Sequence, residues 1–277
     1  MNAVESSARA LLAFWRAAGV DMDEAEAIFV TGASPRAAAP TAVKEPLGRP
    51  PLREPAPPKI RRAATADAPV ENARALAAAA DSIPALRAAI ESFDGCALKK
   101  TARNTVFSDG NINAEVLLIG EAPGKDEDEQ GKPFVGRSGQ MLNQMLAAIG
   151  LNRQDNILIS NTIYWRPPGN RDPTPGETAT CLPFVERLIM LMQPKLLILA
   201  GKAAGNTVLR RDEAVSRMRG RRLQYNREGI ASPINTMVML HPAYLLRQPQ
   251  QKRQAWTDLL LAEAWLDELG VARSPHR

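Results

Sequence analysis

Long apolar runs are missing from this chain of 277 residues. No stretch reaches the length of about 18 apolar residues that a membrane-spanning helix needs. The first residues, with Glu5 and Arg9 around a short apolar patch, also lack the order of charged, apolar and small residues that defines a signal peptide. We therefore expect a protein that does not insert into membranes and that resides in the cytoplasm.

Cysteine and histidine are scarce, with two of each in the sequence. In a reducing cytoplasm the cysteines are expected to remain thiols, so a disulfide framework is excluded. Of the histidines, His276 lies in the terminal tail and only His241 follows a predicted strand. A phosphate-binding loop of the Gly-x4-Gly-Lys-Ser/Thr type is also missing, which argues against a nucleotide hydrolase.

Acidic residues are outnumbered by basic ones, 30 to 35, which gives a net charge of +5 and a pI near 9.4. This balance suits a polyanionic partner, although composition alone does not identify one. Arg217, Arg219, Arg221 and Arg222 flank Gly220, and we predict that they form a turn lying along a phosphate backbone. A solvated surface turn is the alternative.

Composition divides the chain into three parts. Residues 1–30 contain a short helical segment with an apolar face, which could dock on a protein partner. Residues 31–69 are predicted to be a disordered basic linker rich in Pro and Ala. Its residues 34–64 hold eight prolines and seven Lys or Arg against two Glu, with few large apolar side chains to bury. A folded domain is expected over residues 70–277.

Short apolar runs within this domain predict strands that are buried on both faces. They lie at residues 115–119, 156–160, 195–200 and 236–240. Helical patterns lie at residues 71–80, 83–93, 138–149, 176–192, 203–210 and 251–269. Strand and helix alternate at the spacing of a parallel sheet. The expected fold class is therefore α/β, a three-layer α/β/α arrangement with a central four-stranded parallel sheet.

Irregular polar segments follow three of these strands. Residues 120–124, Gly-Glu-Ala-Pro-Gly, end the first strand, and residues 131–136, Gly-Lys-Pro-Phe-Val-Gly, come shortly after. Residues 161–173 follow the second strand, and residues 241–247, which begin with His-Pro, follow the last. Ligands of parallel sheets bind beyond the carboxyl ends of the strands, so we expect these segments to converge on one pocket.

Together these motifs resemble the uracil-DNA glycosylase superfamily, most closely its family 4, over residues 93–269. The resemblance implies the fold of that superfamily. It also implies a DNA repair enzyme that hydrolyses the N-glycosidic bond of uracil, the product of cytosine deamination, and leaves an abasic site. Such an enzyme is monofunctional, takes uracil-containing DNA as its partner and is expected to be a monomer.

An enzyme that acts on a base must extrude it into a pocket, stack on its face and read its Watson–Crick edge. By the resemblance, Phe134 supplies the stacking face and Asn161 matches uracil N3–H and O4. Gly120 and Ala122 would line the floor of the pocket. Core packing is the alternative for Phe134, and capping of a turn is the alternative for Asn161.

His241 and Glu121 are expected to act on the bond itself. His241 would donate a hydrogen bond to uracil O2 as negative charge develops there, which is typically worth about 2.7–4 kcal/mol. Glu121 would position water or stabilise the sugar cation, or it could only hold its loop. Family 1 enzymes carry a water-activating Asp where Ala122 stands in this chain. The sequence therefore does not identify the residue that orients the water. Glu127 would exclude the 5-methyl group of thymine, or belong to a solvated acidic run.

Contacts to DNA are expected from the third motif and from the arginine cluster. Leu245 would fill the space that the extruded base leaves. Arg247 would contact phosphate, together with Arg219 and Arg221. Ala243 stands where family members usually have Ser, so we expect weaker binding of duplex DNA.

Family 4 enzymes typically hold a [4Fe–4S] cluster with four cysteines. Only Cys96 and Cys181 match those positions, while Phe93 and Trp165 occupy the other two. Because neither aromatic side chain can replace a thiolate ligand, we predict no cluster, no metal site and no other cofactor. The missing cysteines also suit an alternative, a catalytically weak DNA-binding or scaffold protein that retains the fold.

A related subgroup that traps its product through a histidine is disfavoured, because no histidine precedes His241. The sequence does not predict the catalytic rate, the preference for single or double strands, or activity on other deaminated bases.

Overall fold

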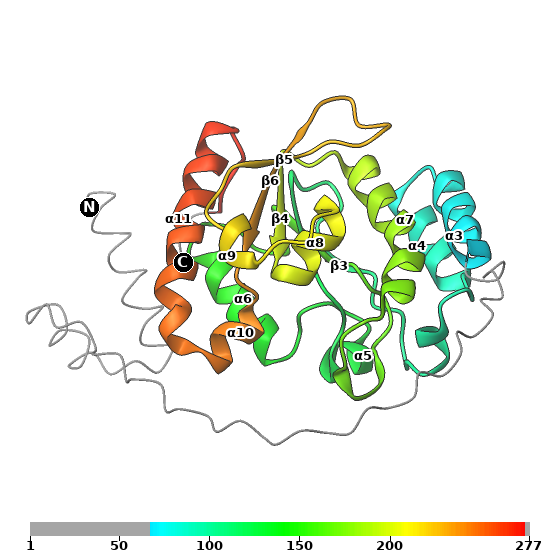
Figure 1. Ribbon diagram of the computed structural model, residues 1–277. Helices are drawn as coiled ribbons and strands as arrows, with labels where there is room; N and C mark the ends of the chain where they lie inside the picture. Colours follow the sequence, from blue (N-terminus) through cyan, green and yellow to red (C-terminus); the bar gives the residue numbers. More distant parts are fainter. Residues whose placement is uncertain (1–66, 275–277) are drawn as a thin grey trace, which may run out of the picture. The chain divides into compact units, whose positions relative to one another are not determined.

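A computed structural model describes residues 67–274 (Figure 1). The predicted N-terminal segment, residues 1–30, and most of the predicted linker lie outside the described residues. Helix α3 (Asp67–Ala79) begins before residue 70, so residues 67–69 of the expected linker are helical. In the described part of the chain, no helix is both long enough and apolar enough to cross a membrane.

A six-stranded sheet forms the centre of the domain, with the strand order β1-β3-β2-β4-β6-β5. The predicted strands are its parallel centre, namely β3 (Ile157–Asn161), β2 (Val116–Gly120), β4 (Leu196–Ala200) and β6 (Ile234–Met239). The prediction lacked the antiparallel edge strands β1 (Ser108–Gly110) and β5 (Leu223–Tyr225). Each edge strand has three residues, too few for a periodic apolar pattern.

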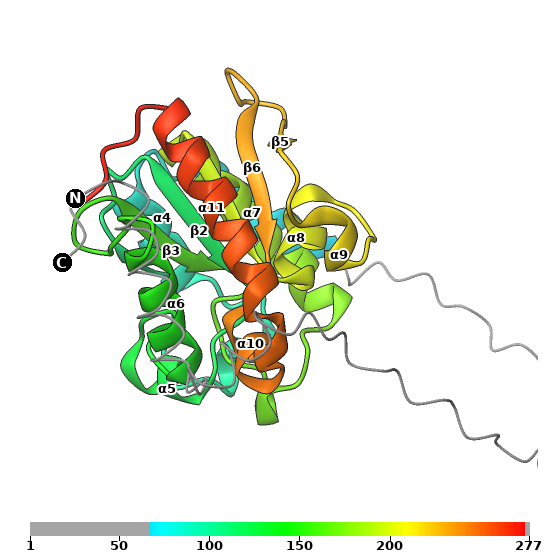
Figure 2. The same ribbon diagram turned by 90° about the vertical axis from the view of Figure 1, so that its left-hand side faces the viewer.

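Helices cover both faces of the sheet, which confirms the three-layer prediction (Figure 2). One face carries α3, α4 (Ile83–Ser92), α7 (Pro175–Met192) and α8 (Lys202–Leu209). The other face carries α6 (Arg137–Ala147) and α11 (Lys252–Glu268). The sequence did not predict the short helices α5 (Lys125–Gln130), α9 (Val215–Met218) and α10 (Pro242–Arg247), nor the 3-10 turns Ala97–Lys100, Pro168–Asn170 and Pro249–Gln251.

The core explains why the central strands are apolar throughout. Strands β2 and β4 are buried at every position, because their side chains pack alternately against the helices on one face of the sheet and on the other. Leu117 and Ile119 of β2 pack with Leu197 of β4 in the cluster that lies beneath α3, α4 and α7. The polar side chains of the pocket therefore come largely from the loops that follow the strands at the carboxyl edge of the sheet.

Arg219 has a structural role that contradicts its predicted contact with DNA. Its Nε lies 3.0 Å from Oδ2 of Asp258, which is fully buried on α11. Burial raises the pKa of Asp258 to about 6, although the Arg219 cation opposes the shift. Arg222 pairs with Glu268 and stacks over the Trp265 ring at 4.9 Å. The loop is thereby tied to α11, whereas Arg221 stays exposed.

Candidate active site

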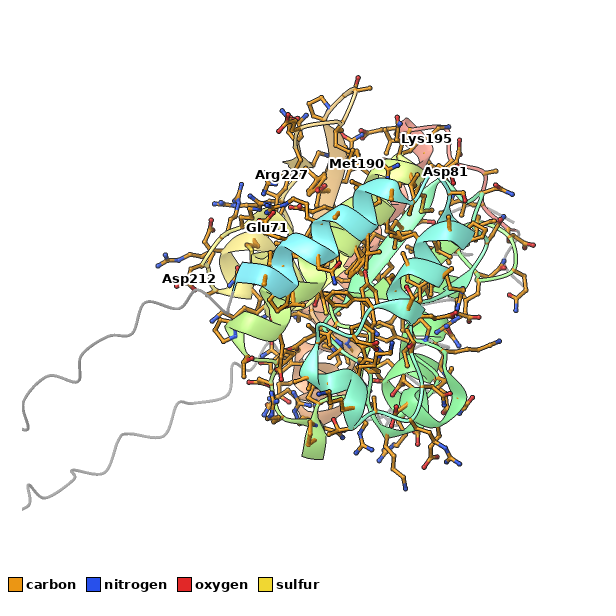
Figure 3. The ribbon with its side chains drawn as sticks, turned by 90° about the vertical axis from the view of Figure 1, so that its right-hand side faces the viewer. Glu71, Asp81, Met190, Lys195, Asp212 and Arg227 are labelled. Carbon is orange, nitrogen blue, oxygen red and sulfur yellow. The ribbon has the colours of Figure 1, made fainter. Side chains whose placement is uncertain are left out.

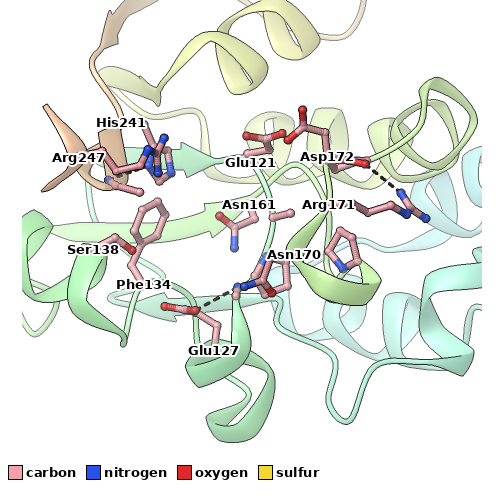
Figure 4. A pocket seen from close by; sticks show the side chains of 16 residues that line it. Glu121, Glu127, Phe134, Ser138, Asn161, Asn170, Arg171, Asp172, His241 and Arg247 are labelled. Atoms are coloured by element: carbon pink, nitrogen blue, oxygen red, sulfur yellow. Dashed lines mark hydrogen bonds between the residues drawn. The ribbon is translucent and has the colours of Figure 1, made fainter. Parts of the chain in front are cut away.

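A pocket of about 280 Å³ opens beyond the carboxyl ends of β2, β3 and β6 (Figure 4). The structure brings most of the predicted site residues together in its wall, as the parallel sheet leads one to expect. These residues are Glu121, Ala122, Glu127, Phe134, Asn161, His241 and Arg247. Gly120 lies directly beneath the Asn161 and Phe134 side chains.

The floor of the pocket is built where two strands end side by side. Gly120 of β2 pairs in register with Asn161 of β3. A Cβ atom on Gly120 would lie 2.5 Å from Asn161 Oδ1 and 2.5 Å from Phe134 Cζ, so any other residue there would displace these two side chains. Asn161 is 2% exposed, and within residues 67–274 its amide group has no hydrogen-bond partner. Asn161 lines the pocket, so its amide can pair with a ligand there.

Phe134 has an unusual backbone conformation, which contacts with neighbouring residues stabilise. Its φ is 54°, in the left-handed region that a bulky residue rarely adopts. Arg153 Nη2 donates a hydrogen bond of 2.6 Å to the Phe134 carbonyl oxygen. A Cβ on Gly139 would lie 1.8 Å from that same oxygen, so helix α6 needs glycine there. The Phe134 ring stacks on His241 at 5.5 Å and 29°, in the pocket wall and outside the central core cluster.

Glu127 anchors the loops of the pocket and does not belong to a solvated acidic run. It is 8% exposed, and its carboxylate accepts hydrogen bonds from the backbone N–H groups of Gly124, Val135 and Gly136 at 2.9–3.0 Å. Asp128 is also buried and accepts from two backbone N–H groups. Each carboxylate can stay buried because it accepts hydrogen bonds from several backbone N–H groups that would otherwise have no partner. The prediction that Glu127 excludes thymine stays a prediction.

His241 is held as a neutral imidazole with a defined tautomer. Its Nδ1 accepts a hydrogen bond of 3.1 Å from the Ala243 N–H at the start of α10, so Nδ1 carries no proton. Burial, together with the positive charge of Arg247, lowers the pKa of His241 to about 4. At neutral pH the proton therefore sits on Nε2, which is available as a donor.

Glu121 stands at the other end of the pocket beside a second carboxylate, Asp172. Burial raises the pKa of Glu121, and the negative charge of Asp172 adds to the effect. Ser138, Asn170 and Asp172 line the same pocket without having been named from the sequence. The last two lie in the polar segment 161–173, whose repeated Pro and Gly residues were the available signal. Ser138 and the loop anchor Arg153 gave no signal.

The structure contradicts the prediction that Leu245 inserts into DNA. Leu245 is fully buried, because the inner face of α10 packs against α6. The exposed side chains of this short helix are Tyr244, which is 37% exposed, and Arg247 at the rim of the pocket. An apolar wedge at Leu245 would require α10 to leave its place in the fold.

Aromatic packing fills the region of the expected cluster ligands. Phe93 and Trp165 are 1% exposed with ring centroids 6.4 Å apart, and the Trp165 indole donates to Thr105 Oγ1 at 3.0 Å. The thiols of Cys96 and Cys181 are buried and hydrogen-bond to each other, which raises the pKa of Cys181 well above its ordinary value. This donor set does not fit a cluster with four thiolate ligands.

Comparison with known proteins agrees with the motifs. A sequence model of the uracil DNA glycosylase superfamily matches residues 107–264. The chain is 37% identical to the type-4 uracil-DNA glycosylase of Archaeoglobus fulgidus over 167 residues, 59% of this chain and 82% of that protein. Identity is 34% to the type-4 uracil-DNA glycosylase of Pyrobaculum aerophilum, over 62% of this chain and 88% of that protein. It is 31% to that of Thermotoga maritima, over 65% and 93%. The chain belongs to the uracil-DNA glycosylase superfamily, among relatives of type 4.

Proposed function

We propose that this protein is a DNA repair glycosylase that hydrolyses the N-glycosidic bond of uracil in DNA and leaves an abasic site. The observation that carries the proposal is Asn161, a buried residue of the pocket floor whose amide forms no hydrogen bond within the described part of the chain and lines the cavity. Uracil N3–H and O4 would satisfy both ends of this amide. Type-4 uracil-DNA glycosylases are also the relatives that this chain matches.

Specificity follows from the donors and acceptors that meet at the floor. The Asn161 amide oxygen accepts from uracil N3–H, and its NH2 group donates to O4. Cytosine presents the reverse pattern at these positions, so each mismatch leaves a buried polar group unpaired at a cost of about 1–3 kcal/mol. Phe134, which stacks on His241 in the pocket wall, supplies the flat face on which the base stacks.

Bond cleavage needs a donor for the departing base. As the bond breaks, its electron pair moves onto the uracil ring and the charge collects largely at O2. The neutral His241 Nε2–H, fixed by the Ala243 N–H on Nδ1, is positioned as that donor. A preorganised donor of this kind is worth about 2.7–4 kcal/mol of barrier. The sugar cation then takes up water, and no lysine lies in the pocket wall for covalent catalysis.

DNA binding is assigned to two exposed arginine side chains. Arg247 lies at the rim, and Arg221 is exposed and unpaired among residues 67–274. Both can approach phosphates, and such contacts weaken with rising salt. We further propose a cytoplasmic monomer, in which any protein partner is recruited by residues 1–66.

The enzyme is proposed to work without an iron–sulfur cluster. The support is the donor set, two thiols with Phe93 and Trp165 packed in the two other ligand positions. The test is iron and sulfide analysis of protein purified anaerobically. We expect neither element in stoichiometric amount, and four irons per chain would contradict the proposal.

The function is tested with a fluorescent oligonucleotide that carries one uracil, single-stranded or opposite G or A, with alkali added to reveal abasic sites. Asn161→Ala and His241→Ala should each lower the single-turnover rate by about 100-fold or more. Asn235→Ala, at the opposite end of the sheet, and His276→Ala are the matched controls and should cleave like wild type. Folded wild-type protein that binds DNA but releases no uracil would favour the scaffold alternative.

A further inference from the structure

Two carboxylates meet at the end of the pocket away from His241. Glu121 follows β2 and Asp172 follows the 3-10 turn Pro168–Asn170, and both line the cavity. Figure 4 shows the two carboxylate groups directed toward each other. Within residues 67–274 neither forms an ion pair. Two carboxyl groups are therefore held close together, and no cation of the described residues pairs with either of them.

The loop that presents Asp172 is fixed from its other side. Arg171 donates to both carboxylate oxygens of Glu177, at 2.9 and 2.7 Å, and this contact lowers the pKa of Glu177 to about 2. Arg171 Nη1 also donates to the backbone carbonyl of Asp172 at 2.9 Å. Thr174 caps helix α7 through Glu177. The neighbouring cation is thus occupied, and the Asp172 side chain is left on the pocket side.

Among the described residues, the other ionisable groups of the pocket wall form no ion pair with Glu121 or Asp172. Glu127 is bound to three backbone N–H groups, and His241 is neutral at ordinary pH. Arg171 is held by Glu177, and Arg247 lies on α10 beside His241. Asp172 is the neighbour whose charge acts on Glu121, where it adds to burial in raising the pKa.

We propose that Asp172 is a positioning residue of the glycosylase reaction, which helps Glu121 to hold the attacking water and strengthens Glu121 as the base that accepts its proton. The inference rests on the proposed function. Asp172 would supply a water-binding carboxylate that the first motif, residues 120–124, lacks, because the methyl group of Ala122 cannot bind water. A base acts best when its pKa approaches the working pH, and a nearby negative charge moves a carboxyl group in that direction.

The C1′–N1 bond breaks, and its electron pair leaves with uracil while the sugar becomes a cation. The water oxygen gives a lone pair to C1′ and forms the new C–O bond. One water proton passes to the Glu121 carboxylate, which later returns it to solvent. Asp172 exchanges no proton in this step, and it touches the water but not the sugar.

The experiment measures single-turnover uracil release against pH for wild type, Asp172→Asn, Asp172→Glu and Glu121→Gln, on saturating single-stranded substrate. In Asp172→Asn we expect the acid limb to move to lower pH and the rate at pH 7.5 to fall about tenfold, because Glu121 becomes a weaker base. DNA affinity should be unchanged. Asp172→Glu should restore the acid limb, and adding Asp172→Asn to Glu121→Gln should cause no further loss.

Asp212→Asn is the matched control, because it removes the same charge from an exposed loop outside the pocket (Figure 3). It should leave the rate and the acid limb as in wild type. An Asp172→Asn variant that is slower but keeps the wild-type acid limb, or one that slows Glu121→Gln further, would overturn the inference and leave the proposed function intact. Wild-type protein that releases no uracil would overturn both.

Discussion

Gly120 controls the space in which a base can lie, since every larger residue would meet the two side chains that define the floor. Its missing Cβ would lie 2.5 Å from Asn161 Oδ1 and from Phe134 Cζ. In Gly120→Ala we expect these side chains to turn into the pocket while the strand keeps its place. A displacement of about 1 Å at a reacting centre can cost about 100-fold in rate.

The measurement is single-turnover uracil release by folded Gly120→Ala, for which we expect a loss of at least about 100-fold. Gly176→Ala is the matched control, because no atom lies within 4 Å of the Cβ that it would gain. That variant should have wild-type activity. Full activity in Gly120→Ala would mean that the base binds elsewhere.

His241 should make stability depend on pH in a defined window. Its pKa is lowered from an ordinary 6.5 to about 4 in the folded protein, so folding favours the neutral form. The stabilisation is present above pH 6.5 and is lost as the pH falls toward 4. One pKa unit corresponds to about 1.4 kcal/mol, which gives a loss of up to about 3 kcal/mol.

Urea unfolding at pH 7 and pH 4.5 tests this prediction. The wild type should lose more stability between the two values than His241→Asn, which cannot be protonated. The comparison between variants is needed because other groups titrate in the same range, among them Asp258 with its pKa of about 6. Equal losses in the two proteins would show that His241 is not the titrating group.

At the scale of elements, the loop before β5 depends on one buried ion pair. Arg219→Ala would leave Asp258 inside α11 without its partner, and breaking such a pair costs about 3–5 kcal/mol. Protonation of Asp258 would reduce that cost. We therefore expect a loss on the order of 3 kcal/mol in the free energy of unfolding, measured with urea at pH 7.5.

Arg221→Ala is the matched control for this loop. Its side chain is exposed, so the free energy of unfolding should change by less than about 0.5 kcal/mol, while DNA affinity should fall and depend less steeply on salt. Unchanged stability in Arg219→Ala would restore the reading of Arg219 as a DNA contact.

At the scale of the whole molecule, the glycosylase domain should work without the preceding part of the chain. The chain divides at Thr65, and the second unit runs to Arg277. Protein that begins at Thr65 should keep the unfolding temperature and the turnover of the full chain on short oligonucleotides. Both proteins are compared by thermal unfolding and by uracil release. A large loss in either quantity would show that residues 1–64 support the fold or the site.

The fold could be predicted from the sequence because the patterns that indicate its strands and turns are local. The strands β2 and β4 are short apolar runs, and such runs predict buried parallel strands wherever helices separate them. The pocket motifs were recognisable for a similar reason, since a close turn needs Gly or Pro at fixed places in the chain. Edge strands of three residues carry no such pattern.

The sequence by itself determined the family, the parallel sheet and the segments that meet at its carboxyl edge, because these follow from the order of apolar runs and turn residues. Only the tertiary structure decided what each polar side chain does there. Burial of Leu245, the hydrogen bonds of Glu127 to backbone N–H groups and the approach of Asp172 to Glu121 all arise from contacts between separate segments of the chain. Such contacts depend on three-dimensional packing, which no local pattern of residues encodes.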